Sequence, residues 1–531
     1  MSSLITNLQN SALFDHPIDK FEVIETHISW VLLTGDFVYK IKKPVNFGFL
    51  DFSTLEKRHF YCKEELRLNR RLAPDLYLDV VTIRGTESHP GFTGKEPIIE
   101  YAVKMRQFPQ SAQLDRILKE QGLELKIIDK LADKVSQFHQ SINAADKDCK
   151  YGDVEHIKQP VMENFQHIRA SIMTLVDDSK GNPRQTIMHT LELLEHWSHQ
   201  QTGELSEIFQ QRKRQGFVRE CHGDMHLRNI ALWQDDIVIF DCIEFNPNFY
   251  WIDVISEIAF LLMDLEDRQQ YLLAIRFLNR YLEATGDYDG MILLRFYKVY
   301  RAMVRAKVAA LRLMQEQPDS TEHKLTYQEF YQYLQLAEQF IRPTAPCLLI
   351  NHGLSGSGKS YSTRIILEKY PAIQIRSDVE RKRLFGLNKE ANKQDEIEKG
   401  IYTAEATNKT YDRLVDIARC LLVEGFSVVV DAANLKPTQR QLFIELAKSL
   451  HVPYFILNYQ ASVDTLRQRV KKRADQSKDV SDATLKVLDY QLETYEPLLS
   501  EEKPFAIDID TSEAIDVDKI IKHIHASAIK F

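Results

Sequence analysis

One eight-residue segment constrains the fold of this chain more than any other part of the sequence. It consists of Gly353, Leu354, Ser355, Gly356, Ser357, Gly358, Lys359 and Ser360, after the apolar run CLLIN and before the helix-forming stretch SYSTRIILEKY. The spacing is G-x-x-x-x-G-K-[ST], in which backbone N–H groups turn toward phosphate oxygens at the start of a helix. The lysine of this pattern reaches the β- and γ-phosphates, and the last hydroxyl holds Mg²⁺. The segment therefore predicts an ATP-binding strand, loop and helix, with Ser360 as a metal ligand.

The sequence that follows this loop indicates a separate α/β domain. Its strand-like runs are CLLIN, AIQIR, FSVVVD, PYFILNY and FAIDI, and helical stretches lie between them. Continuous apolar runs of this kind are typical of a parallel sheet that is buried on both faces. The segment IRPTAP before them has the proline content of a boundary. We therefore predict an α/β P-loop kinase domain with a parallel sheet over 343–531 and another domain over 1–342.

The C-terminal segment resembles the zeta-toxin and polynucleotide-kinase branch of P-loop kinases over 345–531. The resemblance rests on the P-loop, on RSDVER after the strand AIQI, and on VVVDAAN. It implies that Asp378 is the general base for an acceptor hydroxyl and that Arg381 helps to hold the acceptor. Asp431 lies at another strand end, where it supports Mg²⁺ or the P-loop, and a helix or turn cap is the alternative.

A basic run, LRQRVKKR, follows the fourth predicted strand of this domain. It resembles the arginine-bearing lid of a small kinase, in which Arg469 and Arg473 neutralise the charge of the transferring phosphoryl group. Two other interpretations stay open, a solvated helix face and a nucleic-acid-binding patch.

A second set of polar residues lies in the first two-thirds of the chain. The segment HGDMHLRN, from His222 to Asn229, is followed by the strand IVIF and by Asp241. The Asp224-to-Asn229 spacing, with an aspartate after the next strand, matches the catalytic loop and the metal-binding aspartate of protein kinases. Phosphoryl transfer needs a carboxylate that orients the acceptor hydroxyl, and oxygen ligands for Mg²⁺. We predict Asp224 as catalytic and Asn229 and Asp241 as Mg²⁺ ligands, with a metal site of His222, Asp224 and His226 as the alternative.

This loop resembles that of aminoglycoside phosphotransferases and their small-molecule kinase relatives, over about residues 20–340. A β-rich region with a hairpin, HISWVLL-TGD-FVYKIKK, precedes a mainly helical region, as in the bilobal α+β fold of protein kinases. The resemblance implies a strand lysine at the nucleotide phosphates and a helical glutamate that orients it. Lys40 and Glu65 fit these two roles, and Lys42 and Glu64 stay open as alternatives.

Two further residues follow from the same resemblance. Asp253, in WIDVISE, resembles the family's aspartate that supports the catalytic loop from a helix. Glu244 is a candidate for contact with the substrate.

Taken together, the two motif sets resemble a bacterial family described as bifunctional aminoglycoside phosphotransferase/ATP-binding proteins. The resemblance implies ATP and Mg²⁺ as cofactors and transfer of the γ-phosphate to hydroxyl groups of small molecules. The substrate does not follow from the fold, and the carboxylates of 112–215 are too mixed with Lys and Arg to predict an acidic drug site. Two alternatives are a nucleotide-binding switch, in which one domain regulates the other, and a nucleic-acid end kinase.

Composition disfavours several other classes of protein. The net charge of −8 argues against a protein that coats nucleic acid. No apolar run approaches the ~18–20 residues of a membrane span. The six cysteines lack the CxxC spacing of a metal site and indicate reduced thiols. We therefore expect a cytoplasmic protein whose partners are small-molecule phosphate acceptors, with no membrane partner and with nucleic acid disfavoured.

Overall fold

The chain forms two compact units in the computed structural model, which describes residues 3–48, 50–175, 183–318, 320–387, 401, 403–476 and 485–528. The N-terminal unit consists of Met1–Arg268 and Phe296–Phe340, and the C-terminal unit of Gln269–Arg295 and Ile341–Phe531. The predicted domain boundary at residue 343 stays a prediction. The compact units differ from it because Gln269–Arg295, although earlier in the sequence, belongs with the C-terminal unit.

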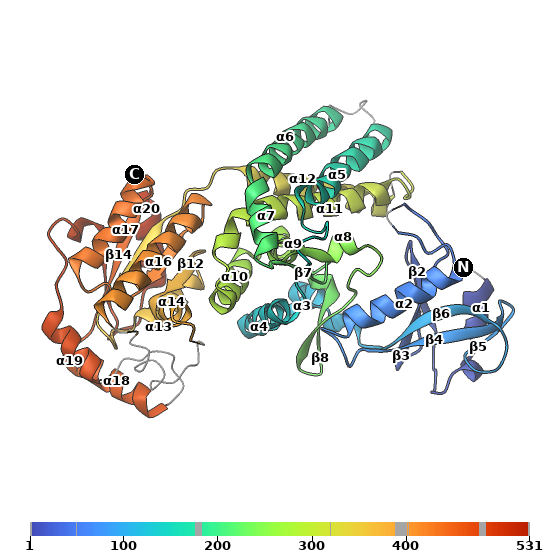
Figure 1. The fold of residues 1–531 in the computed structure, drawn as a ribbon, viewed down its shortest axis with the longest axis horizontal. Helices are drawn as coiled ribbons and strands as arrows, with labels where there is room; N and C mark the ends of the chain where they lie inside the picture. Colours follow the sequence, from blue (N-terminus) through green and yellow to red (C-terminus); the bar gives the residue numbers. More distant parts are fainter. Residues whose placement is uncertain are drawn as a thin grey trace. The chain divides into compact units, whose positions relative to one another are not determined.

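The N-terminal unit begins with a six-stranded antiparallel sheet in the order β1-β2-β3-β6-β4-β5 (Figure 1). Its strands are β1 (Glu22–Glu25), β2 (Ser29–Leu33), β3 (Phe37–Lys42), β4 (Tyr77–Thr86), β5 (His89–Gly91) and β6 (Ile98–Arg106). The predicted hairpin is confirmed, because β2 and β3 pair antiparallel around Gly35. Helix α1 (Ser3–Leu8) packs with Tyr39 and Ile41 on one face of the sheet. Side chains alternate along a strand, so Lys40 and Lys42 point to the opposite face, toward α2 (Leu55–Asn69).

The rest of the N-terminal unit is mainly helical, and together with the sheet it gives the predicted protein-kinase-like α+β fold. One helix, α9, has twelve consecutive buried residues from Val254 to Leu265, so it forms the centre of this part. Two short antiparallel pairs of strands, β7 with β10 and β8 with β9, lie where the sequence predicts the catalytic loop. The strands are β7 (Val218–Glu220), β8 (Ile230–Trp233), β9 (Asp236–Ile239) and β10 (Trp251–Asp253). The helices are α3 (Leu114–Gln121), α4 (Leu125–Ser141), α5 (Val154–Leu175), α6 (Pro183–Glu204), α7 (Ser206–Arg214), α8 (Pro247–Tyr250), α9 (Val254–Asp267), α11 (Leu294–Leu313) and α12 (Thr321–Ile341).

The C-terminal unit confirms the predicted α/β P-loop fold. Its five strands are all parallel, in the order β12-β13-β11-β14-β15. They are β11 (Leu348–His352), β12 (Ile373–Arg376), β13 (Val428–Asp431), β14 (Tyr454–Gln460) and β15 (Ala506–Asp510). The helices are α10 (Tyr271–Thr285), α13 (Lys359–Leu367), α14 (Ser377–Leu384), α16 (Ala404–Val423), α17 (Pro437–Ser449), α18 (Val463–Gln476), α19 (Leu485–Thr494) and α20 (Val517–Ala528). The carboxyl ends of parallel strands meet at one edge, where α/β proteins bind ligands.

Each helix among the described residues is too short or too polar to cross a lipid bilayer. All six cysteines are free thiols, and Cys221 and Cys242, which flank the catalytic-loop motif, are buried.

Candidate active sites

The predicted strand lysine and helical glutamate of the N-terminal unit are in contact. Lys40 Nζ lies 2.8 Å from Glu65 Oε1 and 2.6 Å from Asp241 Oδ1. Burial raises the pKa of Glu65, but the ammonium groups of Lys40 and Lys42 outweigh that effect and lower the pKa to about 2. Glu64, the alternative to Glu65, pairs instead with Arg67 on the same helix. The structure thus brings together Lys40, Glu65 and Asp241, which the sequence places in three separate segments.

Lys42 occupies a different place from Lys40, although both side chains reach Glu65. Lys42 is buried and binds Glu65 Oε2 at 2.7 Å and Glu244 Oε1. Burial raises the pKa of Glu244, itself buried. Lys40 therefore links Glu65 to Asp241, whereas Lys42 links it to Glu244 beneath the site. Glu244, the candidate substrate contact, lies inside the protein against Lys42.

The predicted catalytic loop holds Asp224 through its own residues. Asn229 Nδ2 donates to Asp224 Oδ2 at 3.0 Å, and His226 Nε2 lies 3.4 Å from the same oxygen. Burial raises the pKa of Asp224, but His226 and Arg305 outweigh it, and the net pKa lies below the usual range. The Asp224 carboxylate is therefore ionised at neutral pH, in the form that can orient a hydroxyl group.

The loop is also hydrogen-bonded to the strand that leads to Asp241. His222 Nε2 donates to Phe240 O at 2.8 Å, and Phe240 N donates to Asn229 O at 2.9 Å. The other ring nitrogen of His222 accepts from the N–H of Asp224 at 3.3 Å. Both nitrogens of His222 thus serve the backbone, which argues against the alternative metal site. Asp241 has a φ of 62°, a strained conformation for a residue with a side chain, which turns its carboxylate toward Lys40.

A residue that the sequence reasoning missed, Glu257, holds the catalytic loop from helix α9. Its carboxylate accepts from His222 N at 2.7 Å and from Gly223 N at 2.9 Å. The expectation that Asp253 has this role is wrong, because Asp253 forms a two-bond pair with Arg212 and caps α9 at Ile255 N. Glu257 lies one helical turn after Asp253 on the same face of α9. The prediction therefore named the correct end of this helix but the wrong residue.

Gly223 allows this loop to pass close to the chain that precedes β10. Its φ is +90°, and a Cβ at this position would lie 2.6 Å from Phe249 O. On the other side, Arg301 Nη1 donates to Gly223 O at 3.1 Å. The backbone next to Asp224 is therefore fixed by α9, by α11 and by the segment around Phe249.

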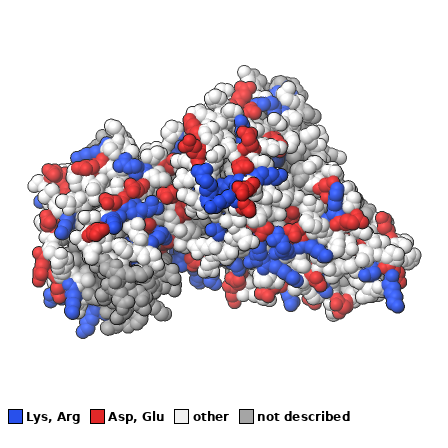
Figure 2. All heavy atoms as spheres, viewed as in Figure 1, with Lys and Arg blue, Asp and Glu red and all other residues white. Residues whose placement is uncertain are grey.

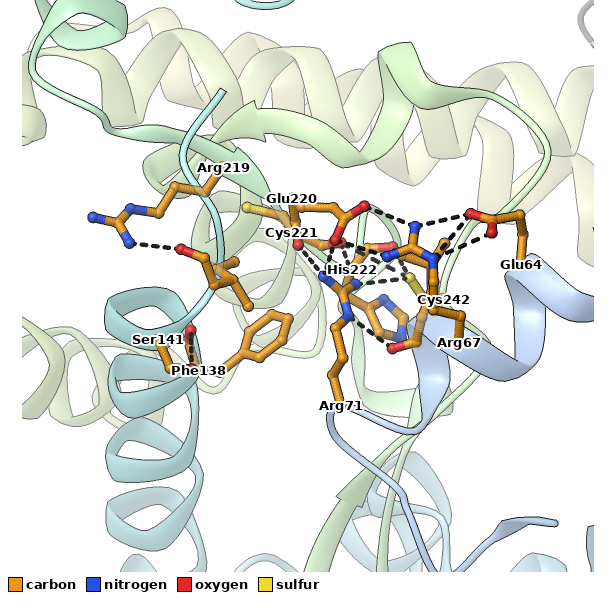
Figure 3. Close-up of polar contacts among 12 residues, drawn as sticks. Glu64, Arg67, Arg71, Phe138, Ser141, Arg219, Glu220, Cys221, His222 and Cys242 are labelled. Atoms are coloured by element: carbon orange, nitrogen blue, oxygen red, sulfur yellow. Dashed lines mark hydrogen bonds and ion pairs between the residues drawn. The ribbon is translucent and has the colours of Figure 1, made fainter. Parts of the chain in front are cut away.

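A network of arginines connects the glutamate-bearing helix α2 to the start of the catalytic loop (Figure 3). Arg67 Nη2 lies 2.8 Å from Glu220 Oε1, and Arg71, just after the helix, contacts the Glu220 carboxylate at 3.1 Å. Arg71 Nη2 also donates to Cys221 O at 3.1 Å. Because Glu65 lies on the same helix, this network fixes the helix that carries Glu65 against the chain that carries Asp224. Arg67, Arg71 and Glu220 belong to no motif in the sequence.

Loss of the Glu257 carboxylate is expected to destabilise the N-terminal unit by about 3 kcal/mol, because hydrogen bonds to a charged group are worth about 1.5–3 kcal/mol each. The variant Glu257→Ala leaves the N–H groups of His222 and Gly223 buried without this acceptor. Thermal unfolding of the full chain measures the effect, with the exposed Glu204→Ala on α6 as the control. Equal melting temperatures for the two variants would contradict the assigned role of Glu257.

The P-loop of the C-terminal unit connects β11 to α13, as the sequence predicts. Lys359 Nζ donates to Gly353 O at 2.7 Å and to Leu354 O at 2.9 Å, so the lysine folds back over its own loop. Gly356 has a φ of +82°, and a Cβ there would lie 2.8 Å from Leu466 O of α18. The N–H of Ser355 donates to Gln491 Oε1 of α19 at 2.8 Å. Gln491 is a second residue that the sequence reasoning missed, because it belongs to none of the motifs.

The predicted acidic residues of this unit lie at the carboxyl ends of β12 and β13. Asp378 begins α14 and pairs with Arg376, whose Nη2 lies 2.8 Å from Asp378 Oδ2. Asp431 is buried and accepts from Asn351 Nδ2 at 3.1 Å and from Gln374 Nε2 at 2.8 Å. Burial raises the pKa of Asp431. Neighbouring β12 and β13 thus present Asp378 and Asp431 at the edge of the sheet where β11 leads into the P-loop.

The other predicted residues of the C-terminal site lie on α14, α13 and α18. Arg381 is half-buried on α14, one turn after Asp378, and Ser360 is exposed on the first turn of α13. Arg469 Nη1 donates to Thr511 Oγ1 at 2.8 Å and to Gly356 O at 3.4 Å, so this arginine is held against the P-loop. The side chain of Arg473 lies outside the described residues.

The predicted metal ligands of both units carry oxygen atoms of the kind that Mg²⁺ binds in kinases, namely one or two carboxylates with amide or hydroxyl oxygens. In the N-terminal unit these are the Asp241 carboxylate, which is half exposed, and the amide oxygen of Asn229, whose nitrogen is used for Asp224. In the C-terminal unit they are Asp431 and Ser360. A divalent cation would favour the ionised form of the buried Asp431 carboxylate, which burial alone disfavours.

Comparison with known sequences places a family model, described as AAA domain, on residues 348–498, within the C-terminal unit. "Uncharacterized protein Mb2027c" of Mycobacterium bovis is 29% identical over 470 residues, which span 88% of this chain and 89% of the relative. "Uncharacterized protein Rv2004c" of Mycobacterium tuberculosis matches to the same extent. The sequence similarity to these relatives thus extends over more residues than either unit contains, whereas the family match lies in one unit.

The solved structures that match this chain include three kinases. Amicoumacin kinase hAmiN is 12% identical, with a TM-score of 0.39, over 62% of this chain and 93% of that structure. The Plasmodium vivax ethanolamine kinase is 10% identical, with a TM-score of 0.36, over 62% of this chain and 86% of that structure. A gluconokinase from Sinorhizobium meliloti is 19% identical, with a TM-score of 0.24, over 36% of this chain and 94% of that structure.

Proposed function

We propose that this chain is a Mg²⁺- and ATP-dependent phosphotransferase with two kinase-type sites, each of which transfers the γ-phosphate of ATP to a hydroxyl group of a small molecule. The observation that carries the proposal is the contact of Lys40 Nζ with Glu65 and Asp241 at 2.8 and 2.6 Å, in a unit where Asn229 also holds Asp224. These are the groups that kinase-like phosphoryl transfer requires.

In the N-terminal site, each residue has one task in this proposal. Lys40, oriented by Glu65, neutralises charge on the nucleotide phosphates. Asn229 and Asp241 hold Mg²⁺, which stabilises charge on the transferring phosphoryl group. Asp224 accepts a hydrogen bond from the acceptor hydroxyl and directs its oxygen toward the γ-phosphorus.

In the C-terminal site, the P-loop takes over the role of binding the phosphates. Backbone N–H groups of Gly353 to Ser360 and the Lys359 ammonium bind them, and Ser360 and Asp431 hold Mg²⁺. Asp378 takes the proton of the second acceptor hydroxyl. Arg381 contacts the acceptor, and Arg469, already against Gly356 O, neutralises charge that develops in the transition state.

A shallow hollow in the N-terminal unit, lined by residues of α5 and of the segment 248–256, supports an uncharged acceptor for this unit. Its aromatic wall includes the rings of Tyr151 and Trp251, stacked 5.9 Å apart. His156 Nδ1 and Asn248 Oδ1, on the lining residues, have no hydrogen-bond partner among the described residues. Asp253, the one carboxylate of the lining, is already paired with Arg212. Aromatic rings with an imidazole and an amide, and without an unpaired carboxylate among the described lining residues, suit a sugar-like polyol better than the polycationic aminoglycosides.

The charge on the face drawn in Figure 2 gives no support to a nucleic-acid end kinase. On the face drawn in Figure 2, Lys and Arg side chains lie among Asp and Glu side chains over both units. A protein that tracks a phosphate backbone concentrates positive charge along the binding path instead.

The proposal is tested by ATP consumption of the purified chain with a small-metabolite extract divided into neutral and cationic fractions. We expect the neutral fraction to stimulate turnover and purified aminoglycosides to have no effect. Stimulation by the cationic fraction alone would contradict the uncharged acceptor. Absence of stimulation by either fraction would contradict small-molecule phosphotransfer and favour the nucleotide-binding switch.

A further inference from the structure

A helix from the middle of the sequence covers the edge strand of the parallel sheet in the C-terminal unit. This strand leads to Asp378, the predicted general base. Helix α10 packs on β12, the edge strand of the parallel sheet. Asn279 Nδ2 donates to Ala372 O at 2.9 Å, and Gln374 N donates to Asn279 Oδ1 at 2.7 Å. One side-chain amide thus pairs with the edge backbone as a neighbouring strand would, and covers an edge that would otherwise stay open.

The same helix and the turn after it also hold α14, which carries Asp378 and Arg381. Arg383 Nη2 donates to Glu283 O at 2.7 Å. A Cβ at Gly286, where φ is +74°, would lie 2.5 Å from Arg383 Nε, so the turn and α14 are in close contact. The last turn of α14, the helix that carries Asp378 in its first turn, is therefore fixed partly by residues that precede the P-loop in sequence.

Within this contact, one guanidinium group lies between two carboxylates. Arg376 Nη2 is 2.8 Å from Asp378 Oδ2 and its Nε is 3.2 Å from Asp378 Oδ1, while Nη1 is 3.6 Å from Glu283 Oε2. The three side chains are 17 to 29% exposed, so solvent screens their charges only in part.

We propose that Glu283 is a positioning residue for the C-terminal phosphotransfer, because it attracts the Arg376 guanidinium and so weakens the hold of Arg376 on the Asp378 carboxylate, which takes the acceptor proton. This inference rests on the proposed function. In that reaction the acceptor hydroxyl gives its proton to Asp378 and its oxygen bonds to the γ-phosphorus of ATP. The bond from that phosphorus to the β–γ bridging oxygen breaks, and ADP leaves.

The charge arrangement explains why the second carboxylate matters. With Glu283 present, the single positive charge of Arg376 acts on Glu283 as well as on Asp378 and Asp431. Without Glu283, more of that charge acts on Asp378, and the two-bond pair with Arg376 becomes tighter. A carboxylate held more tightly in this way is less able to turn toward an acceptor hydroxyl.

The test uses the full chain with Asp224→Asn, which silences the N-terminal site, and compares Glu283→Gln with Glu283→Asp. ATP turnover is measured without acceptor and with the neutral extract fraction, and ATP binding is measured separately. We expect Glu283→Gln to lower kcat about tenfold with a KM for ATP within about twofold of the parent. Glu283→Asp, which keeps the charge, is expected to recover most of that loss.

Asn279→Ala is the matched control, because it removes two contacts of the same helix to the same strand but leaves the three charged groups unchanged. A purely structural role of α10 predicts the same kinetic change for Asn279→Ala and Glu283→Gln, and that result would overturn the inference. Unchanged kcat in Glu283→Gln, or loss of its ATP binding, would also overturn it. The variant Lys359→Ala distinguishes failure of the proposed function from failure of this inference. If the C-terminal unit transfers no phosphate, Lys359→Ala leaves the turnover of the Asp224→Asn chain unchanged.

Discussion

Replacement of Asp224 by asparagine is expected to lower acceptor-dependent turnover at the N-terminal site by about 10²–10⁴-fold, the usual contribution of a general base. Asn229 and His226 both contact the Asp224 carboxylate. Asparagine keeps the size of the side chain, but it carries no negative charge and takes no proton from a hydroxyl. We therefore expect kcat to fall while the affinity for ATP changes by less than about twofold.

The measurement is ATP consumption with the neutral extract fraction, in chains that also carry Lys359→Ala so that the C-terminal site is silent. Asp236→Asn is the matched control, because Asp236 is an exposed aspartate of β9 whose contact is with Lys134. A loss of less than about threefold in Asp224→Asn would show that another group orients the acceptor.

The choice between Lys40 and Lys42 shows what a strand pattern cannot resolve. The two lysines are separated by two positions, so alternation puts both on the face that meets α2, and both indeed reach Glu65. What separates them is the neighbour from the far part of the chain, Asp241 for Lys40 and Glu244 for Lys42. That difference depends on tertiary contacts between residues about 200 positions apart, which local sequence does not encode.

The residue that supports the catalytic loop shows a second limit of prediction from sequence. The segment WIDVISE correctly predicted a helix that holds the loop, but resemblance selected Asp253 by residue type. Four residues on, Glu257 projects from the same helix face and binds the loop N–H groups, while Arg212 takes Asp253. The pairing of Asp253 with Arg212 excludes Asp253 from the role of supporting the loop. This pairing could not be predicted, because Arg212 belongs to no motif in the sequence.

The sequence did not predict that Gln269–Arg295 belongs with the C-terminal unit, and the reason is physical. Helix α10 has an ordinary amphipathic pattern that fits either a helical lobe or a sheet edge. Its partners, the backbone of Ala372 and Gln374, have no side-chain signature. The P-loop, in contrast, was predictable residue by residue, because its function depends on local backbone geometry that only a few residue types allow.

In the C-terminal unit, the largest loss is expected from Lys359→Ala, measured in chains that also carry Asp224→Asn. Lys359 donates to the carbonyls of Gly353 and Leu354, so its ammonium group closes the loop whose N–H groups are proposed to bind phosphates. Its removal takes away the one lysine of the P-loop motif, and we expect turnover to fall about 10²-fold or more, with weaker ATP binding. Lys369→Ala, at an exposed lysine paired with Asp518, is the matched control.

The variant Lys359→Ala, tested in a chain with an intact Asp224, distinguishes two hypotheses. Either both units are kinases that act independently, or the P-loop unit binds nucleotide and regulates the N-terminal site. If the sites act independently, Lys359→Ala removes part of the turnover, Asp224→Asn removes the rest, and the double variant retains none. If the P-loop unit is instead a nucleotide-binding switch, Lys359→Ala alone abolishes the turnover that depends on Asp224, because the N-terminal site then requires nucleotide in the other unit. Independent losses are expected, because each unit contains its own predicted catalytic carboxylate, Asp224 or Asp378, and its own residues that are proposed to bind phosphates.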